Sequence, residues 1–192
     1  MGLMCQNAAS CTHTDSQDFN GSVRPQIEAF IRAVMEHHFQ ATPEAWQRDD
    51  SFHAYYNWGS LCGANDLERA WPEYLRWPAP TIGGRRDEPV RTGDRSIAMA
   101  APQSGLGIRI PLPGGSVTHY VDHRIKALIN ATNPMHVLHP GYIVRWLSVR
   151  GVMTASNTLG RGIGWTPRVN EYFGVRIFSE LDEDVRAHLP QR

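Results

Sequence analysis

The order of hydrophobic periodicities along the chain is the feature that most constrains its fold. Apolar residues recur at helical spacing near the N-terminus, change to strand-like runs from about residue 96 onward, and return to a helical pattern near the end. Runs of helix followed by runs of strand favour an α+β domain over a doubly wound parallel sheet. We therefore expect N-terminal helices, then a mostly antiparallel curved sheet, with a C-terminal helix.

Three helices are expected in the first part of the chain. The first covers residues 25–40, with Ser22 as a possible N-cap, and a short one covers residues 42–48, where Thr42 precedes Pro43. The third covers residues 67–77. The aromatic segment 52–58 between them is either a strand or an irregular buried run, and the Pro- and Gly-rich segment 78–95 is expected to be a long loop.

Five later segments have strand-like patterns, and segment 118–129 is compatible with a helix as well. They are residues 96–101, 107–112, 118–129, 142–155 and 169–177. Ser179 is then a candidate N-cap for a closing helix that ends at His188. Four acidic residues from Glu180 to Asp184 would lie in its first turns, where they complement the helix dipole.

Length and composition limit the organisation of the chain and its partners. The 192 residues fit one globular domain, 23–192, preceded by a polar tail, 1–22, that we expect to be disordered or loosely packed. The 19 basic and 19 acidic residues balance, which argues against a nucleic-acid partner. We find no apolar run of about 18 residues that would indicate a membrane span, and no secretory signal. The protein is therefore expected to be soluble, and either cytoplasmic or exported without a cleaved signal peptide; its oligomeric state stays open.

The segment from Asn130 to Arg145 is the densest group of chemically versatile side chains. His136 and His139 lie in a turn-rich stretch, and histidine titrates near neutral pH, so both are candidate acid–base residues. Arg145 follows on a strand and would hold an anionic group. Asn130 and Thr132 would orient a substrate or a water molecule. The alternative is that these residues satisfy backbone groups in turns or pack at the base of a loop.

A second group lies in residues 118–124. His119 and His123 share a face in either a helix or a strand, and with His136 or His139 they would form a three-histidine zinc site with an open position. No metalloenzyme signature accompanies them, so we expect no metal and no other cofactor, with zinc as the alternative. Asp122 would orient a histidine of the other group.

Three further features are weaker candidates. Cys62 precedes the helix expected at residue 67, where the helix dipole would acidify a nucleophilic thiol, although a buried core cysteine is the commoner case. The glycine-rich run 160–164 precedes no helix and is expected to be a flexible loop near the site rather than a phosphate-binding loop. Asn170 would return to the same region and contact the substrate.

Two parts of the chain resemble known proteins. Residues 25–77, with their long helix, short helix, aromatic strand and Gly-Ala-Asn-Asp-Leu turn, resemble nuclear-transport-factor-2-like (SnoaL-type) enzymes. That resemblance implies a cone-shaped pocket and makes Tyr55, Asn57, Asp122 and His123 the nearest equivalents of the family's site residues, with Tyr55 in contact with substrate. The closing helix departs from that family, whose domain ends on a strand.

The second resemblance covers residues 130–189. A His-x-x-His-Pro-Gly-x-x-x-Arg run, a Gly-rich loop and a terminal helix resemble the tails of uncharacterised bacterial secreted or effector-like proteins. This resemblance implies a bacterial source but no particular activity.

Three functional hypotheses follow from these residues. The preferred one is a small bacterial enzyme, a hydrolase of a small-molecule or polymer substrate, either a metabolic enzyme or a delivered toxin or effector. Its catalytic residues would be His136, His139, Asp122, His123 and Arg145, and it requires the two histidine groups to meet. The second is a nuclear-transport-factor-2-like isomerase, dehydratase or cyclase that acts on a small apolar substrate. The third is a non-catalytic binding module.

Overall fold

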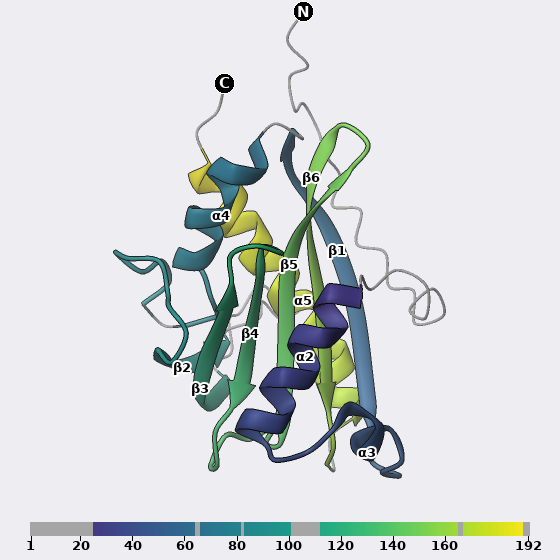
Figure 1. Ribbon diagram of the computed structural model, residues 1–192. Helices are drawn as coiled ribbons and strands as arrows, with labels where there is room; N and C mark the ends of the chain where they lie inside the picture. The colour runs from purple at the N-terminus through teal and green to yellow at the C-terminus, as the bar shows by residue number, and fades with distance from the viewer. Residues whose placement is uncertain (1–24, 64–65, 82, 101–111, 165–166, 190–192) are drawn as a thin grey trace, which may run out of the picture.

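The computed structural model describes residues 25–63, 66–81, 83–100, 112–164 and 167–189, and it confirms the expected α+β class (Figure 1). Six antiparallel strands form one curved, open sheet in the order β1-β6-β5-β4-β3-β2. The bounds of the strands are β1 His53–Gly63, β2 Arg95–Ala100, β3 Leu112–Asp122, β4 Ala127–Thr132, β5 Gly141–Arg150 and β6 Met153–Gly162. β2 to β6 follow one another as a meander, whereas β1 comes from the first part of the chain and pairs with the last strand.

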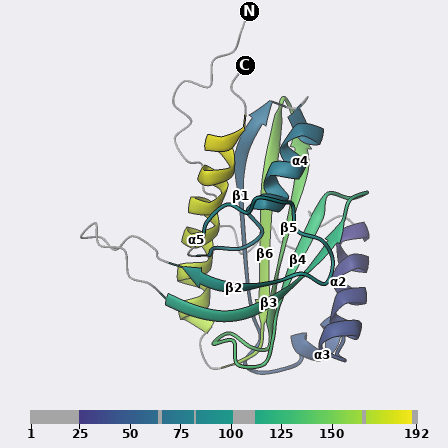
Figure 2. The ribbon, with the colours of Figure 1, turned by 90° about the vertical axis from the view of Figure 1, so that its left-hand side faces the viewer.

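Helices cover both faces of the sheet, so the domain has three layers (Figure 2). One face carries α2 (Pro25–His38) and α3 (Pro43–Gln47), and the opposite face carries α4 (Leu67–Arg76) and α5 (Pro167–His188). Each pair of helices packs on its own apolar cluster. No described helix combines the length and the apolar composition needed to cross a bilayer.

Alternation along β5 shows how one strand serves both cores. Tyr142, Val144 and Trp146 belong to the cluster under α2, whereas Leu147 belongs to the cluster under α4 and α5. Arg145 points to this second side and is completely buried. A strand covered on both faces is apolar on both faces, which explains the nearly continuous hydrophobic run seen in the sequence.

The expected N-terminal elements are confirmed. α2 and α4 lie within the predicted helical ranges, and Pro72 lies inside α4. Thr42 is the N-cap of α3, and its hydroxyl accepts a hydrogen bond of 3.2 Å from the amide of Ala45. The aromatic segment 52–58 lies in β1, apart from Phe52, which precedes the strand.

Two of the predicted strands are hairpins. Segment 118–129 contains the end of β3, a turn and the start of β4, and segment 142–155 contains β5, a turn at Gly151 and the start of β6. Gly151 has a φ of 59°, a left-handed conformation that suits glycine in a tight turn. The predicted strand 107–112 lies outside the described residues except for Leu112, which begins β3, and so does the tail 1–22.

The predicted strand 169–177 is wrong, because α5 already begins at Pro167. β-Branched and aromatic residues give this segment a strand-like pattern, but packing against β1 outweighs that preference. Ser179 is therefore not an N-cap: its hydroxyl donates a hydrogen bond of 2.9 Å to the carbonyl of Val175 inside the helix. The acidic residues that follow it lie in the C-terminal half of α5, so they do not complement the dipole of its N-terminus.

The glycine-rich run 160–164 is also not a loop over its whole length, since Gly160 and Gly162 belong to β6. A Cβ at Gly160 would lie 2.2 Å from Cε1 of Tyr55, so this strand position is glycine because a ring packs on the backbone. Cys62 belongs to β1, and its side chain lies outside the described residues, so its role as a nucleophile stays a prediction.

Candidate functional site

A layer of buried polar side chains lies between the sheet and helices α4 and α5, and we call it the polar layer. Its members come from five elements that are distant in sequence. They are Tyr55 and Asn57 of β1, Tyr74 of α4, Arg145 of β5, Ser156 and Thr158 of β6, and Asp182 of α5. None is more than 6% exposed to solvent.

An ion pair forms the centre of the polar layer. Arg145 Nη2 donates to Asp182 Oδ1 at 2.8 Å, and Arg145 Nη1 donates to the carbonyl of Trp77 at 2.6 Å. The guanidinium carbon lies 4.2 Å from the centroid of the Tyr74 ring, a cation–π distance. Arg145 therefore links β5 to the end of α4 and to α5.

Asp182 accepts a second hydrogen bond at the same oxygen. Ser156 Oγ lies 2.8 Å from Asp182 Oδ1 and 2.8 Å from the hydroxyl of Tyr74. Because Ser156 donates to the carboxylate, the Tyr74 hydroxyl donates to Ser156 and completes a chain of three groups. Burial raises the pKa of Asp182, while Arg145 and Ser156 act in the opposite direction.

Four polar atoms in the polar layer are buried without a hydrogen-bond partner among the described residues. They are the Tyr55 hydroxyl, Asn57 Oδ1, Thr158 Oγ1 and Arg145 Nε; a fifth such atom, Arg76 Nε, belongs to α4. Leaving a buried donor or acceptor unsatisfied costs about 1–3 kcal/mol. Such atoms in a native interior are usually completed by an ordered water or a bound molecule.

The strand register brings three of these residues into one row. Asn57 is the cross-strand partner of Thr158, and Thr158 is the partner of Arg145, so the row crosses β1, β6 and β5. Directly opposed residues have their Cβ atoms about 4.5–5.5 Å apart. Tyr55 lies two residues before Asn57 on the same face of β1.

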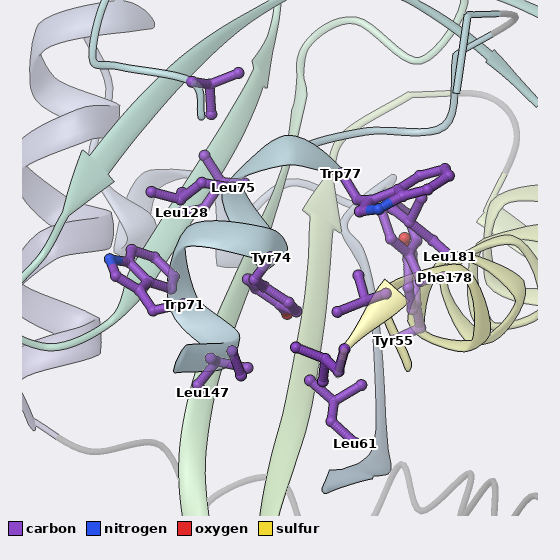
Figure 3. Close-up of a cluster of buried hydrophobic side chains, with 14 residues drawn as sticks. Tyr55, Leu61, Trp71, Tyr74, Leu75, Trp77, Leu128, Leu147, Phe178 and Leu181 are labelled. Atoms are coloured by element: carbon purple, nitrogen blue, oxygen red, sulfur yellow. The ribbon is translucent and has the colours of Figure 1, made fainter. Parts of the chain in front are cut away.

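Glycines allow α5 to approach the sheet closely at Tyr55. A Cβ at Gly174 of α5 would lie 2.4 Å from Cζ of Tyr55, and Gly160 lies against the same ring from β6. Figure 3 shows Tyr55 beside Phe178 and Leu181, the α5 side chains of the same apolar cluster. Burial raises the pKa of Tyr55, so its hydroxyl is neutral and able to donate.

Of the residues predicted from sequence, Arg145, Tyr55 and Asn57 lie in the polar layer. Asp122 and His123 lie at the turn between β3 and β4, where Trp71 Nε1 donates to His123 Nδ1 at 3.0 Å. Asp122 accepts a 2.9 Å hydrogen bond from the amide of Arg124 and holds the turn.

His136 and His139 lie in the turn between β4 and β5. His136 Nδ1 accepts a 3.0 Å hydrogen bond from the amide of Leu138, and burial lowers the pKa of His136 to about 4. His139 Nδ1 donates to the carbonyl of Thr132 at 3.0 Å.

The expected meeting of His123 with His136 and His139 is not formed. The turns that hold them lie at opposite ends of β4, which is six residues long. An extended strand of that length separates its ends by roughly 20 Å. The catalytic roles assigned to these residues stay predictions, but they do not share one site.

His119 and Asn130 form a buried pair on neighbouring strands. His119 Nδ1 lies 2.7 Å from Asn130 Oδ1, and His119 Nε2 lies 2.8 Å from Ser96 Oγ. Asn130 Nδ2 donates to the carbonyl of Pro78 at 2.6 Å. Both ring nitrogens of His119 are thus occupied, and the described residues contain no group of three or more His, Cys, Asp or Glu side chains arranged to hold a metal ion.

The two other predicted contact residues are placed differently. Thr132 Oγ1 donates to the carbonyl of Gly141 at 2.8 Å and accepts from its amide at 2.9 Å, so Thr132 fixes the start of β5. Asn170 lies in α5, and its side chain is outside the described residues.

Sequence reasoning missed most of the polar layer. The sequence pattern places Asp182 among the helix-dipole residues, points to Tyr55 and Asn57 only through the family resemblance, and does not single out Tyr74. One signal was present in β6, where Thr154, Ser156 and Thr158 alternate with Ala155 and Asn157 along a strand that is buried from end to end except for its first residue. A strand with so many polar residues on a covered face indicates a polar interior.

No protein-family model and no curated protein matches the chain. Among solved structures it is similar to protein Ms6760 from Mycobacterium smegmatis (13% identity, TM-score 0.47, covering 72% of this chain and 91% of that one). It is also similar to the protein encoded by BPP1335 from Bordetella parapertussis, with 13% identity and a TM-score of 0.38, over 75% of this chain and 79% of that one. A third similar structure is the di-domain ARO/CYC BexL from the BE-7585A biosynthetic pathway, with 8% identity and a TM-score of 0.45, over 88% of this chain and 62% of that one. The resemblance is structural only, and at these values it assigns no chemistry to this chain.

Proposed function

We propose that this protein binds a small, largely apolar molecule between the sheet and helices α4 and α5, and acts on it by acid–base chemistry of the isomerase, dehydratase or cyclase type. The observation that carries the proposal is the group of four unpartnered polar atoms in the polar layer. Native interiors contain roughly a few such atoms per 100 residues, and each calls for an explanation such as an ordered water or a bound molecule. Four of them, framed by an apolar cluster, are what a mostly apolar ligand with one polar group requires.

Asp182 is the residue we propose for proton transfer. Burial raises the pKa of its carboxyl, which brings the group closer to neutral pH, where a general acid or base works best. Ser156 and Arg145 both hold Oδ1, so the other carboxylate oxygen makes no hydrogen bond to a described residue. Oδ2 lies 3.8 Å from the position of a Cβ at Gly59, where β1 carries no side chain.

The hydrolase hypothesis based on His136 and His139 stays a prediction, as does the role of a toxin or effector. The hydrogen bonds of both histidines are local to the turn and the adjoining strand, and the nearest carboxylate predicted for them, Asp122, lies at the other end of β4. No contact among the described residues favours hydrolysis there over a structural role.

Protein-observed NMR with a library of small uncharged and charged aromatic and alicyclic molecules tests the proposal. We expect binders to shift the amide resonances of β1 around Tyr55–Gly59 and of β6 around Ser156–Gly160. Binders that shift only the turn 133–140 would favour the histidine site. A library without any binder to the folded protein would contradict the proposal.

A further inference from the structure

The unpartnered atoms of the polar layer also indicate what kind of polar group the ligand carries. We infer that this group is uncharged and both donates and accepts hydrogen bonds, as the hydroxyl of a phenol or an alicyclic alcohol does. This inference rests on the proposed function and specifies its substrate class.

The charge of the polar layer is the first reason. Arg145 is its one cation and Asp182 its one anion, and they lie 2.8 Å apart in a direct ion pair. The formal charge of the layer is therefore zero. A carboxylate or phosphate on the ligand would enter this buried region without a free cation to pair with, which is strongly unfavourable.

The amide orientation of Asn57 is the second reason. Ser179 Oγ donates its proton to the carbonyl of Val175, so it can only accept from Asn57, and Asn57 Nδ2 lies 3.4 Å from it. This assignment leaves Oδ1 of Asn57 as the atom without a partner. An amide oxygen accepts hydrogen bonds and never donates them.

Arg145 Nε, in contrast to Asn57 Oδ1, needs an acceptor from the ligand. A guanidinium N–H only donates, whereas the hydroxyls of Thr158 and Tyr55 do either. The ligand must therefore offer a donor to Asn57 Oδ1 and an acceptor to Arg145 Nε. A carboxylate only accepts and an ammonium only donates, whereas a hydroxyl group has both functions.

The surroundings favour a ring as the carrier of that hydroxyl. Tyr55 and Phe178 belong to the apolar cluster around the polar layer, and Tyr74 adds a third ring. Aromatic side chains pack against flat ring systems in offset or edge-to-face arrangements.

Equilibrium dialysis at pH 7 with three matched probes tests the inference: 2-naphthol, 2-naphthoate and naphthalene. Phenol, benzoate and toluene repeat the comparison for a smaller site. We expect the uncharged hydroxyl compound to bind at least about tenfold more tightly than its two analogues in one of the series, as one satisfied hydrogen bond would give.

Two conservative variants locate the effect. Asn57→Leu and Thr158→Val remove an unpartnered amide oxygen and an unpartnered hydroxyl at almost constant volume, so we expect both to fold, and circular dichroism checks this. Each should reduce the ratio between the affinity for the hydroxyl compound and that for the hydrocarbon, and Asn57→Leu should reduce it more, because it removes the acceptor of the ligand's proton. Tyr56→Phe, on the neighbouring residue that faces α2, is the matched control and should not alter the preference.

The possible outcomes separate the two proposals. Tighter binding of the carboxylate would overturn the inference and leave the proposed function in place. Equal binding of all three probes, unaffected by Thr158→Val, would also overturn it, since ordered water alone would then satisfy the unpartnered atoms. Absence of binding in both series would overturn the proposed function together with the inference.

Discussion

Arg145 carries a positive charge in the interior of the domain, and a single carboxylate compensates it. The side chains of Arg145 and Asp182 are 0% and 4% exposed, so solvent screens neither of them. Removing one partner of a buried pair leaves an uncompensated charge, whereas replacing both with apolar residues of similar volume is often neutral. The ion pair is therefore expected to contribute more to the arrangement of α4, α5 and β5 than to net stability.

Urea unfolding of single and double variants checks this expectation. Arg145→Met and Asp182→Leu should each lower the free energy of unfolding by about 3–5 kcal/mol, and the double variant should recover most of the loss. Arg32→Met removes a pair on the surface, where the two side chains are 46% and 52% exposed, and should change stability by less than about 1 kcal/mol. A double variant no more stable than either single variant would contradict the expectation.

His136 makes the stability of the domain depend on pH. Its pKa is about 4 in the folded state against 6.5 in the unfolded state, because burial disfavours the charged ring. A lowered folded-state pKa means that the contribution is complete above pH 6.5 and is lost as the pH falls toward 4. Burial lowers the pKa of His119 too, which adds a loss of the same sign.

We expect the free energy of unfolding to fall by about 2 kcal/mol between pH 7 and pH 4 on account of His136, since one pKa unit corresponds to about 1.4 kcal/mol and residual solvent access weakens the effect. His136→Gln should flatten this part of the profile, measured by urea unfolding at several pH values. His37→Gln changes an exposed histidine and is the control. If the free energy of unfolding of His136→Gln fell with pH as steeply as that of the wild type, protonation of His136 would not destabilise the folded state.

At the scale of single elements, the approach of α5 to the sheet depends on glycine. A helical glycine exposed to solvent is normally about 1 kcal/mol worse than alanine. Gly174 is an exception, because a Cβ there would lie 2.4 Å from a ring carbon of Tyr55. Helix propensity and packing therefore oppose each other at this position.

We expect packing to prevail, so that Gly174→Ala lowers the free energy of unfolding by about 1–3 kcal/mol, as overpacking usually does. Tyr55→Leu should recover part of that loss when it is combined with Gly174→Ala. Ala33→Gly on the exposed face of α2 measures the ordinary propensity difference in this protein. A Gly174→Ala variant more stable than the wild type in thermal unfolding would show that α5 has room to move.

At the scale of the whole molecule, the two edges of the sheet differ. β1 and β2 are both edge strands, but β1 lies against α5, with Arg186 of α5 donating to the carbonyl of Ser60 at 2.7 Å. β2 pairs with β3 alone, and Ile97 in its middle is 67% exposed. Edge strands with few packing contacts open more readily than central ones.

Hydrogen exchange followed by mass spectrometry should therefore give an asymmetric pattern. Peptides from β5 and β6, which are central and covered on both faces, should exchange most slowly. β1 should be intermediate, and β2 should exchange fastest among the strands. Equal protection of β1 and β2 would mean that α5 does not stabilise the edge it covers.

The sequence by itself determined the elements whose signals are local. Helical periodicity and the Thr42-Pro43 cap predicted α2, α3 and α4, and the order of helices and strands predicted the α+β class with a closing helix. It failed for residues 169–177, where β-branched and aromatic residues lie in a helix, and for Gly160, where a ring from another strand explains the glycine. In both places a partner distant in sequence decides the conformation, and local patterns carry no information about such a partner.

The candidate site depended almost entirely on the tertiary structure. The sequence singled out Arg145 directly, and Tyr55 and Asn57 through a family resemblance, but grouped them with histidines that β4 holds at opposite ends of the sheet. Only the pairing of β1 with β6 brings Asn57 beside Thr158 and Arg145, and only the packing of α5 brings Asp182 to the same place. Side-chain chemistry is a property of each residue and can be found in the sequence. Whether a buried polar group finds a partner is a property of the space around it, which exists only once the sheet and its helices have come together.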